Sequence, residues 1–305
     1  MRRPARVLLA GVGRVGSAFL ELAAARPELE VGAVVRSTGP TVDELLAGGG
    51  WDVVADATPS DLTTGGPALV HARAALGAGV HFATAAKGPL VRGHGELREL
   101  ARRTGAGFRF SAATGAALPT VDTVEFALAG ARVLAMEGVL NGTSNYVLDR
   151  MGESVELETA LAEARERGIA DGDGRADVAG ADTAAKLVAI ANAVWGGDLA
   201  LEDVAVTGIE GLDPAQVRAA ARAGEAVRLI GRAVLEEGRV RAEVRPVRVT
   251  RDHPLAGLRG ADKAITFETD TMGRLTLSGG RSDPRAAGAA LLRDVLLLLR
   301  VGPRA

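Results

Sequence analysis

The chain has 305 residues, of which 47% are hydrophobic and 3% aromatic, and its 36 basic side chains nearly balance 38 acidic ones. This length suits two domains. The absence of cysteine excludes disulfides, thiolate metal sites and cysteine nucleophiles. A formal net charge of -2 without a basic stripe argues against nucleic-acid binding. No apolar run reaches the roughly 18 residues that suggest a membrane span. Small-molecule chemistry is therefore the leading class.

The first part of the chain alternates short apolar runs with helical segments. Strands are expected at 6–10, 30–35, 53–57, 80–84 and 107–112, with helices between them. Such alternation is typical of an α/β protein with a doubly wound parallel sheet. We therefore predict an N-terminal Rossmann domain over residues 1–130, completed by a C-terminal helix over residues 284–305.

The pattern changes in the second part of the chain. A strand at 133–140 leads to helices around 156–167 and 182–195, and further strands are expected at 239–249, 264–268 and 274–277. The alternation within 239–249 changes phase at Pro246, which predicts a bulge or a sheet edge. We predict an α+β domain with a mixed sheet over residues 131–283, serving substrate binding and dimerisation.

A glycine-rich segment joins the first strand to the first helix, and it reads Gly11, Val12, Gly13, Arg14, Val15, Gly16. In this context a GxGxxG pattern lets the backbone approach a pyrophosphate at a helix N-terminus, although a tight turn without a ligand is the alternative.

Two further segments bear on the cofactor. Arg36 and Ser37 end the second strand, where NAD-binding proteins carry an acidic residue for the ribose hydroxyls. This favours NADP(H) with NAD still possible, and a solvated arginine is the alternative. Thr58 and Pro59 follow the third strand and are expected to line the nicotinamide side.

Lysine is rare in this chain. Arginine supplies 33 of the 36 basic residues, and the three lysines are Lys87, Lys186 and Lys263. Arginine does not release its proton near neutral pH, whereas a lysine in a desolvated site can. Arginine therefore cannot replace a lysine that takes part in proton transfer. Lys263 lies in a loop before a strand, and we assign it no role.

Four aspartates, Asp171, Asp173, Asp177 and Asp182, precede Lys186. A calcium loop is excluded because Ala176 stands where such a loop needs glycine. Asp182 and Lys186 are four residues apart on a helix that is apolar on nearly every side. We expect this pair to face a cleft, with a structural ion pair as the alternative.

Five segments occur in the order and spacing of homoserine dehydrogenases: GVGRVG (11–16), AKGPL (86–90), LNGTSNY (140–146), DVAGADTAAK (177–186) and DHPLA (252–256). The chain resembles this family over almost its whole length. The resemblance implies interconversion of L-homoserine and L-aspartate 4-semialdehyde with a nicotinamide cofactor, for which Arg36 favours NADP(H), in threonine and methionine biosynthesis in the cytoplasm. It also implies a homodimer whose partner covers the second sheet, and a short form without a C-terminal ACT domain. We expect no metal, nucleic-acid or membrane partner.

The resemblance also implies residue roles. It places Lys186 and Lys87 at the reacting oxygen, while which of them delivers the proton stays open. By the same resemblance, Asp182 and Asp177 help to hold the substrate and its ammonium group. Gly142 and Thr143 shape the pocket, and Asp171 belongs to the substrate loop.

The chain departs from the family pattern at several positions. Ala86 replaces an asparagine, Asp171 a glutamate and Ile169 an aromatic residue, while Ser111 replaces a glutamate associated with a monovalent cation site. Two alternatives therefore stay open: an NADP-binding sensor or structural homologue that has lost catalysis, and an oxidoreductase for another small aldehyde or alcohol. A sugar or cyclitol oxidoreductase is disfavoured, because its Asp-x-x-x-His motif has no histidine available between His94 and His253.

Overall fold

The computed structural model describes residues 3–170, 172–280 and 282–300. The chain divides into two compact units. Unit 1 contains Met1–Pro119 and Asp283–Ala305, and unit 2 contains Thr120–Ser282.

Unit 1 is built on a five-stranded sheet with the order β2-β1-β3-β4-β5, in which all pairs are parallel. Its strands are β1 (Ala5–Ala10), β2 (Leu29–Val35), β3 (Val53–Asp56), β4 (His81–Thr84) and β5 (Phe108–Arg109). β1 and β3 lie at the centre of the sheet and are almost wholly buried, because helices cover both faces.

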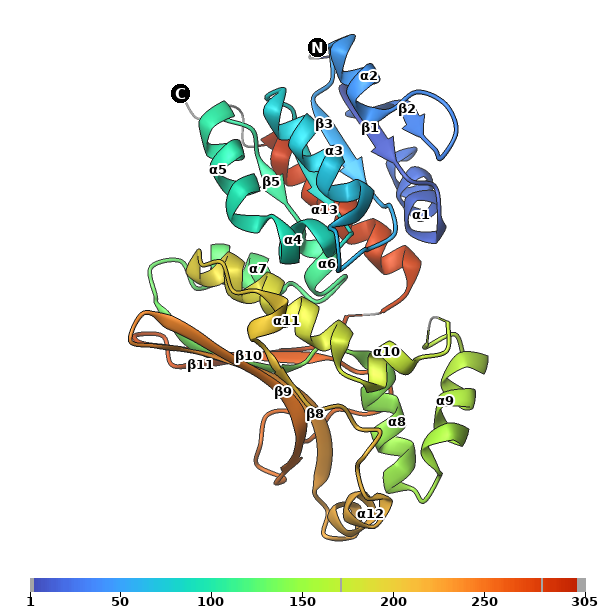
Figure 1. Ribbon diagram of the computed structural model, residues 1–305, viewed down its shortest axis with the longest axis vertical. Coiled ribbons are helices and arrows are strands. Elements are labelled where there is room, and N and C mark those ends of the chain that lie inside the picture. The colour runs from blue at the N-terminus through green and yellow to red at the C-terminus, as the bar shows by residue number, and fades with distance from the viewer. Residues whose placement is uncertain (1–2, 171, 281, 301–305) are drawn as a thin grey trace. The chain divides into compact units, whose positions relative to one another are not determined.

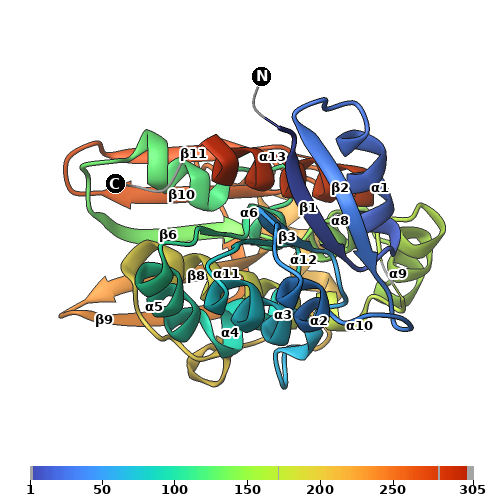
Figure 2. The same cartoon turned by 90° about the horizontal axis from the view of Figure 1, so that it is seen from above.

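Helices flank this sheet on both sides (Figure 2). One face packs against α1 (Arg14–Ala23) and α13 (Pro284–Arg300) through a core that includes Phe19, Leu291 and Val295. The other face packs against α3 (Gly66–Gly77) and α5 (His94–Thr104). The shorter helices are α2 (Val42–Ala47), α4 (Gly88–Arg92) and α6 (Ser111–Thr114). The predicted doubly wound parallel sheet is confirmed.

β5 is shorter than the strand expected at 107–112. Helix α6 begins at Ser111, whose backbone N–H and hydroxyl both donate to the Asp294 carboxylate of α13 at 2.7 Å. A backbone N–H held by a side chain is not available to a strand ladder. The pattern of apolar residues at 107–112 carries no sign of this partner, which is more than 180 residues away.

Unit 2 is built on a six-stranded sheet with the order β11-β10-β6-β8-β9-β7. Its strands are β6 (Val133–Val139), β7 (Ala205–Val206), β8 (Ala226–Glu236), β9 (Arg239–Val249), β10 (Ala264–Thr269) and β11 (Arg274–Ser278). β7 runs parallel to β9 and the other pairs are antiparallel. The predicted mixed sheet is therefore confirmed.

Helices complete unit 2. They are α7 (Thr120–Asp122), η1 (Thr123–Ala127), α8 (Gly142–Gly152), α9 (Leu157–Glu166), α10 (Arg175–Val178), α11 (Ala181–Trp195), η2 (Leu201–Asp203) and α12 (Pro214–Arg222). α11 lies along the sheet (Figure 1), so closely that a Cβ on Gly231 of β8 would be 3.1 Å from the Thr183 methyl group. In the described ranges, no helix combines the length and apolarity needed to cross a membrane.

Two strand expectations in unit 2 need correction. β8 was not predicted, because Val227–Gly231 are all buried, including Arg228, and this part of the strand shows no apolar-polar alternation. A bulge at Pro246 was also wrong: β9 pairs with β8 through Pro246 without a register shift. Pro246 lies beyond the two residues of β9 that pair with β7, so it occupies an edge position, where a missing N–H is tolerated.

Candidate active site

In unit 1, the predicted cofactor residues gather where the parallel strands end. The glycine-rich segment follows β1, Arg36 and Ser37 follow β2, Thr58 and Pro59 follow β3, and Lys87 lies three residues after β4. Arg36 and Ser37 are exposed, and Lys87 is half-buried. The carboxyl ends of the strands form one edge of the sheet, which is where ligands bind in open α/β folds.

The glycines of this segment have separate steric roles. Gly11 has a φ of +88°, and a Cβ there would lie 2.8 Å from the Ala57 carbonyl oxygen. A Cβ on Gly16 would lie 2.0 Å from the Gly11 carbonyl oxygen. Gly13, by contrast, has open space around its Cβ position and precedes α1, which has no side-chain cap and no acidic residue in its first turn. This cradle fits the pyrophosphate of a dinucleotide.

A buried carboxylate holds the loop after β3. Asp56 is 0% exposed, and its Oδ1 accepts hydrogen bonds from the Thr58 backbone N–H (3.1 Å) and hydroxyl (2.8 Å). Its Oδ2 lies 2.7 Å from His71 Nδ1. Sequence reasoning missed Asp56, although a carboxylate that ends an otherwise apolar strand is a usable signal.

The loop that carries Lys87 is fixed through its backbone. The Lys87 N–H donates to the Ser60 hydroxyl at 2.9 Å, and the Ala86 N–H donates to the Thr84 hydroxyl at 2.9 Å. A Cβ on Gly88 would lie only 2.4 Å from the Gly65 carbonyl oxygen. These contacts hold the start of α4 close to the loop after β3 and give Lys87 a defined backbone position.

In unit 2, Lys186 and Asp182 form an ion pair in the first turns of α11. The Lys186 Nζ donates to Asp182 Oδ2 at 2.7 Å and to the Leu140 carbonyl oxygen at 2.9 Å. Each of the two charged side chains is 17% exposed. A pair in contact with solvent over so small an area is much less screened than a surface pair.

Asn141 joins two carboxylates at this pair. Its side-chain amide donates to Asp177 Oδ1 at 2.7 Å and to Asp182 Oδ2 at 2.8 Å. The amide oxygen accepts from the Ser144 backbone N–H at 2.8 Å, and it thereby caps the N-terminus of α8. Sequence reasoning assigned Asn141 no role, although asparagine directly before a helix is a recognised cap.

The raised pKa of Asp177 reflects its surroundings. Burial is the main cause and the Asp182 charge adds to it, whereas hydrogen bonds from Asn141 and Thr143 and the Lys186 charge act in the opposite direction. A buried carboxylate beside another negative charge is stabilised strongly by an added positive charge. The Asp177 and Asp182 carboxylates can therefore hold a ligand's ammonium group.

The start of α8 is pressed against a neighbouring loop. A Cβ on Gly142 would lie 2.8 Å from the Ala261 carbonyl oxygen, and Thr143 Oγ1 donates to the Ile169 carbonyl oxygen at 3.2 Å. The structure thus brings Gly142, Thr143, Asp177, Asp182 and Lys186 together in unit 2. Asp171, predicted for the same site, lies outside the described residues.

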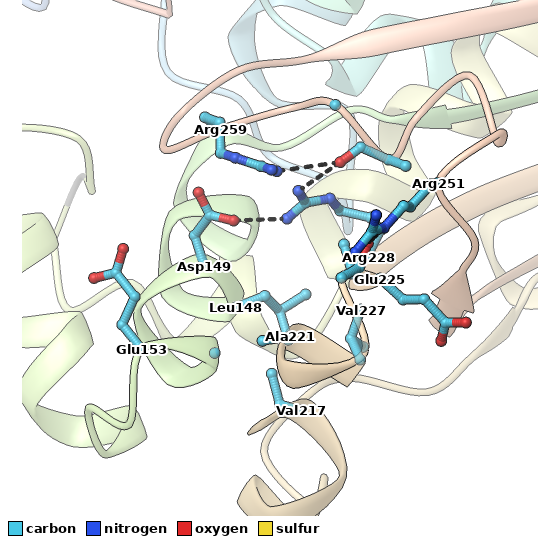
Figure 3. Close-up of a pocket in the computed structure, with 15 residues that line it drawn as sticks. Leu148, Asp149, Glu153, Val217, Ala221, Glu225, Val227, Arg228, Arg251 and Arg259 are labelled. Atoms are coloured by element: carbon cyan, nitrogen blue, oxygen red, sulfur yellow. Dashed lines mark hydrogen bonds and ion pairs between the residues drawn. The ribbon is translucent and has the colours of Figure 1, made fainter. Parts of the chain in front are cut away.

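A separate cavity in unit 2 opens between α8, α12 and β8 (Figure 3). It has a volume of about 510 Å³, and Arg228, which is buried in its wall, donates to Asp149 at 3.0 Å. Three arginines and three acidic residues line it, namely Arg228, Arg251, Arg259, Asp149, Glu153 and Glu225. Because these charges balance, the lining has no excess charge that would favour an anionic ligand.

The chain is similar in sequence to known proteins of one enzyme family. The model of the homoserine dehydrogenase family matches residues 119–296. A homoserine dehydrogenase of Methanocaldococcus jannaschii is 38% identical over 246 residues, which are 80% of this chain and 72% of the relative. An NAD(+)-dependent homoserine dehydrogenase of Pseudomonas canavaninivorans is 34% identical over 277 residues, which are 89% of this chain and 79% of the relative.

A solved structure agrees with these relatives. The crystal structure of a homoserine dehydrogenase from Thiobacillus denitrificans superimposes with a TM-score of 0.85 at 26% identity. The match covers 98% of this chain and 74% of that one.

Proposed function

The chain belongs to the homoserine dehydrogenase family and is an NAD(P)-dependent oxidoreductase acting on a CH–OH group; from this we propose how its own residues carry out the reaction. The reaction interconverts L-homoserine and L-aspartate 4-semialdehyde. The observation that carries the residue assignment is the cluster of Lys186, Asp182, Asn141 and Asp177 in unit 2.

Lys186 is the proposed proton donor in the direction of aldehyde reduction. Hydride addition to the aldehyde carbon leaves negative charge on oxygen, which an ammonium group stabilises and then protonates. The Lys186 Nζ is held by Asp182 and the Leu140 carbonyl, which use two of its three N–H donors. The third is proposed to donate to the substrate oxygen. In the reverse direction the same nitrogen, unprotonated, receives the hydroxyl proton.

Asp177 and Asp182 are the proposed ligands of the substrate's ammonium group. Their carboxylates share the Asn141 amide, which holds them a short distance apart without neutralising them. Gly142 and Thr143 are proposed to shape the adjacent wall, because the close approach of Gly142 to the Ala261 carbonyl leaves no room for a side chain. Asp171 is proposed for this pocket on the family resemblance alone.

The nicotinamide cofactor, when bound, supplies or takes up the hydride. In unit 1, Gly13 and the uncapped start of α1 are proposed to bind its pyrophosphate, with Val12, Arg14 and Val15 in the same turn. Thr58, which is held by Asp56, and Pro59 are proposed to contact its nicotinamide end. Lys87 is proposed as a second catalytic lysine on the family motif that contains it.

We further propose a preference for NADP(H) over NAD(H). Arg36 and Ser37 directly follow β2 and are exposed, so a guanidinium and a hydroxyl are available to a 2′-phosphate. One relative is NAD(+)-dependent, so similarity to the family does not by itself imply NADP(H). The residues after β2 of this chain, and not its family, are therefore the basis of the proposal.

Unit 1 is proposed to bind the cofactor and unit 2 the substrate.

A homodimer is proposed to form through unit 2. On the face of the sheet opposite α11, Glu137, Arg232 and Glu243 are cross-strand neighbours. This row of alternating charge offers a second copy a complementary pairing surface. Light scattering checks the assembly, and a mass near 31.2 kDa at micromolar concentration would contradict it.

One assay tests the activity and the cofactor together. Reduced nicotinamide is followed by its absorbance with L-homoserine and either NADP+ or NAD+. We expect turnover with both and a higher kcat/KM with NADP+. A protein that binds NADPH but turns over neither L-homoserine nor L-aspartate 4-semialdehyde would instead be the noncatalytic sensor, and turnover of another alcohol alone would identify a different substrate.

A further inference from the structure

Lys263 is a buried lysine in unit 2 to which the reaction above gives no part. It is 2% exposed and directly precedes β10. Lysine side chains usually keep their ammonium group in water, so a buried one needs an explanation. It is also one of only three lysines in a chain that otherwise uses arginine.

Strand register places Lys263 beside Lys186. In the antiparallel pair of β10 and β6, Ala264 is opposite Val139, so the next position outward sets Lys263 opposite Leu140. Residues in such positions have Cβ atoms about 4.5–5.5 Å apart. The Leu140 carbonyl is the acceptor of the Lys186 ammonium group. Both lysines therefore meet at the end of β6.

The direction of the side chain agrees with this placement. Ala264 packs with Val139 and Ile230 in a core on one face of the sheet, whereas Gly231, next to Ile230, faces α11. Because alternate residues of a strand face opposite sides, Lys263 is directed to the side of α11. Its backbone is fixed as well, since its carbonyl accepts from the Gly279 N–H at 2.9 Å.

Two charged groups that act on Lys263, Lys186 and Asp182, come from α11. Burial and the Lys186 charge lower the pKa of Lys263 to about 8, and the Asp182 charge opposes them. From α8 the neighbouring polar group is the Asn145 amide, which donates to the Asp262 carbonyl at 3.3 Å. The Asp262 carboxylate accepts from the Arg259 backbone N–H at 3.0 Å.

We propose that Lys263 is a positioning residue that sets the net charge of the substrate's ammonium site. While Lys186 is an ammonium group, protonated Lys263 makes the cluster of two carboxylates (Asp177 and Asp182) and two lysines neutral, and unprotonated Lys263 leaves it one negative charge. When Lys186 has released its proton, as homoserine oxidation requires, both totals become one unit more negative. In either state of Lys186, loss of the Lys263 proton adds one negative charge for the ammonium group of an amino-acid substrate. This inference rests on the proposed function of the cluster.

The charge change predicts a pH dependence of binding and not of the chemical step. One unit of charge near a bound ammonium group is expected to change affinity on the order of tenfold in a partly buried site. The KM for L-homoserine should therefore fall about tenfold as the pH rises through about 8, with a smaller change in kcat.

Two variants separate charge from packing. Lys263→Met has a similar length and no charge, and a buried charge exchanged for an apolar group is generally tolerated. It should show the low KM throughout from about pH 6 to about pH 9. Lys263→Arg keeps its charge at every pH in that range, so its KM should stay high. A KM that still falls through about pH 8 in Lys263→Met would overturn the proposal.

Lysine NMR tests the same inference without turnover. Labelling the lysine ε-carbons with carbon-13 gives three signals from three lysines. The Lys263 signal, identified by its loss in Lys263→Met or by elimination with Lys186→Arg and Lys87→Arg, should titrate near pH 8. By linkage, saturating L-homoserine should lower that midpoint by about one unit if coupling is tenfold.

The outcomes are distinct from those of the activity assay. A Lys263 signal that titrates at the ordinary lysine value of about 10.4, or a midpoint that homoserine leaves unchanged, overturns the proposal even in an active enzyme. Absence of homoserine turnover with a midpoint that shifts on homoserine binding would refute catalysis while supporting the role of Lys263.

Discussion

Replacing Asn141 by aspartate changes one amide nitrogen into oxygen at the junction of the active-site cluster. The cap of α8 survives, because a carboxylate oxygen accepts the Ser144 N–H as the amide oxygen does. The other side of the group changes from a donor to an acceptor. It then faces Asp177 Oδ1 and Asp182 Oδ2, to which the amide donates at 2.7 and 2.8 Å.

The expected cost follows from these two contacts. Each hydrogen bond to a charged group contributes about 1.5–3 kcal/mol, so losing both costs about 3–6 kcal/mol at pH values where all three carboxyls are ionised. The site is too buried for water to compensate fully, since Asn141 is 5% exposed. When the introduced carboxyl is protonated it can donate to one of the two carboxylates, and the cost falls to about 1.5–3 kcal/mol.

The sign of the pH dependence is fixed by the two neighbouring carboxylates. They raise the pKa of the introduced carboxyl in the folded protein above its unfolded value of about 3.9. The folded state of Asn141→Asp therefore binds a proton that the unfolded state has released. Relative to the wild type, stability is retained at low pH and is lost as the pH rises through the folded pKa.

Urea unfolding at about pH 5 and about pH 8 measures this difference. Trp195 lies at the end of α11, and its indole N–H donates to the Val133 carbonyl at 2.8 Å, so its fluorescence reports on unit 2. A Trp51→Phe background removes the signal of the other tryptophan. Asn141→Ser, which can still cap α8 but adds no charge, is the matched control and should change less between the two pH values.

Two results would refute the reasoning. A variant as stable as the wild type at about pH 8 would mean that the Asn141 amide does not bridge the carboxylates. A cost that grows as the pH falls would mean that the introduced group is stabilised as an anion, in contradiction of the cluster's charge.

Three further predictions concern single side chains. Lys186→Arg should keep the ion pair with Asp182 yet lower kcat by about 100-fold or more, because arginine does not exchange a proton, and near-normal turnover would exclude lysine chemistry there. Arg36→Ala should lower the ratio of kcat/KM for NADP+ over NAD+ by about tenfold; an unchanged ratio would make Arg36 a surface residue only. Asp294→Asn should destabilise unit 1 by about 1.5–3 kcal/mol, read from Trp51 fluorescence during urea unfolding, because Ser111 then loses a charged acceptor. An unfolding midpoint equal to that of the wild type would mean that the contact contributes nothing.

Sequence reasoning succeeded where one local pattern determines the structure. The alternation of apolar strands and helices predicted the parallel sheet of unit 1, because its elements are close in sequence. Its buried strands appear as short apolar runs and its helices as segments with a periodic apolar face. The glycine-rich turn was equally readable, since Gly11 and Gly16 occupy positions where backbone atoms leave no space for a side chain.

Prediction from the sequence failed for residues whose role depends on a partner far along the chain. Asn141 is unremarkable until Asp177 and Asp182 fold against it, and Lys263 gains a neighbour only when β10 pairs with β6. The rarity of lysine pointed to Lys263, but its position in a loop before a strand outweighed that signal. Burial and strand register, which sequence periodicity does not supply for an isolated residue, are what bring Lys263 to the cluster.

The placement of α13 has a consequence for synthesis on the ribosome. The N-terminal sheet packs one face against Leu291, Val295 and Leu298, which are translated after the whole of unit 2. Unit 2 is continuous and can fold as soon as it emerges, whereas the first 119 residues keep the part of this apolar face that α13 later covers exposed until α13 is synthesised. We expect chaperones to bind residues 1–119 of the nascent chain and to dissociate from them when α13 packs against the sheet.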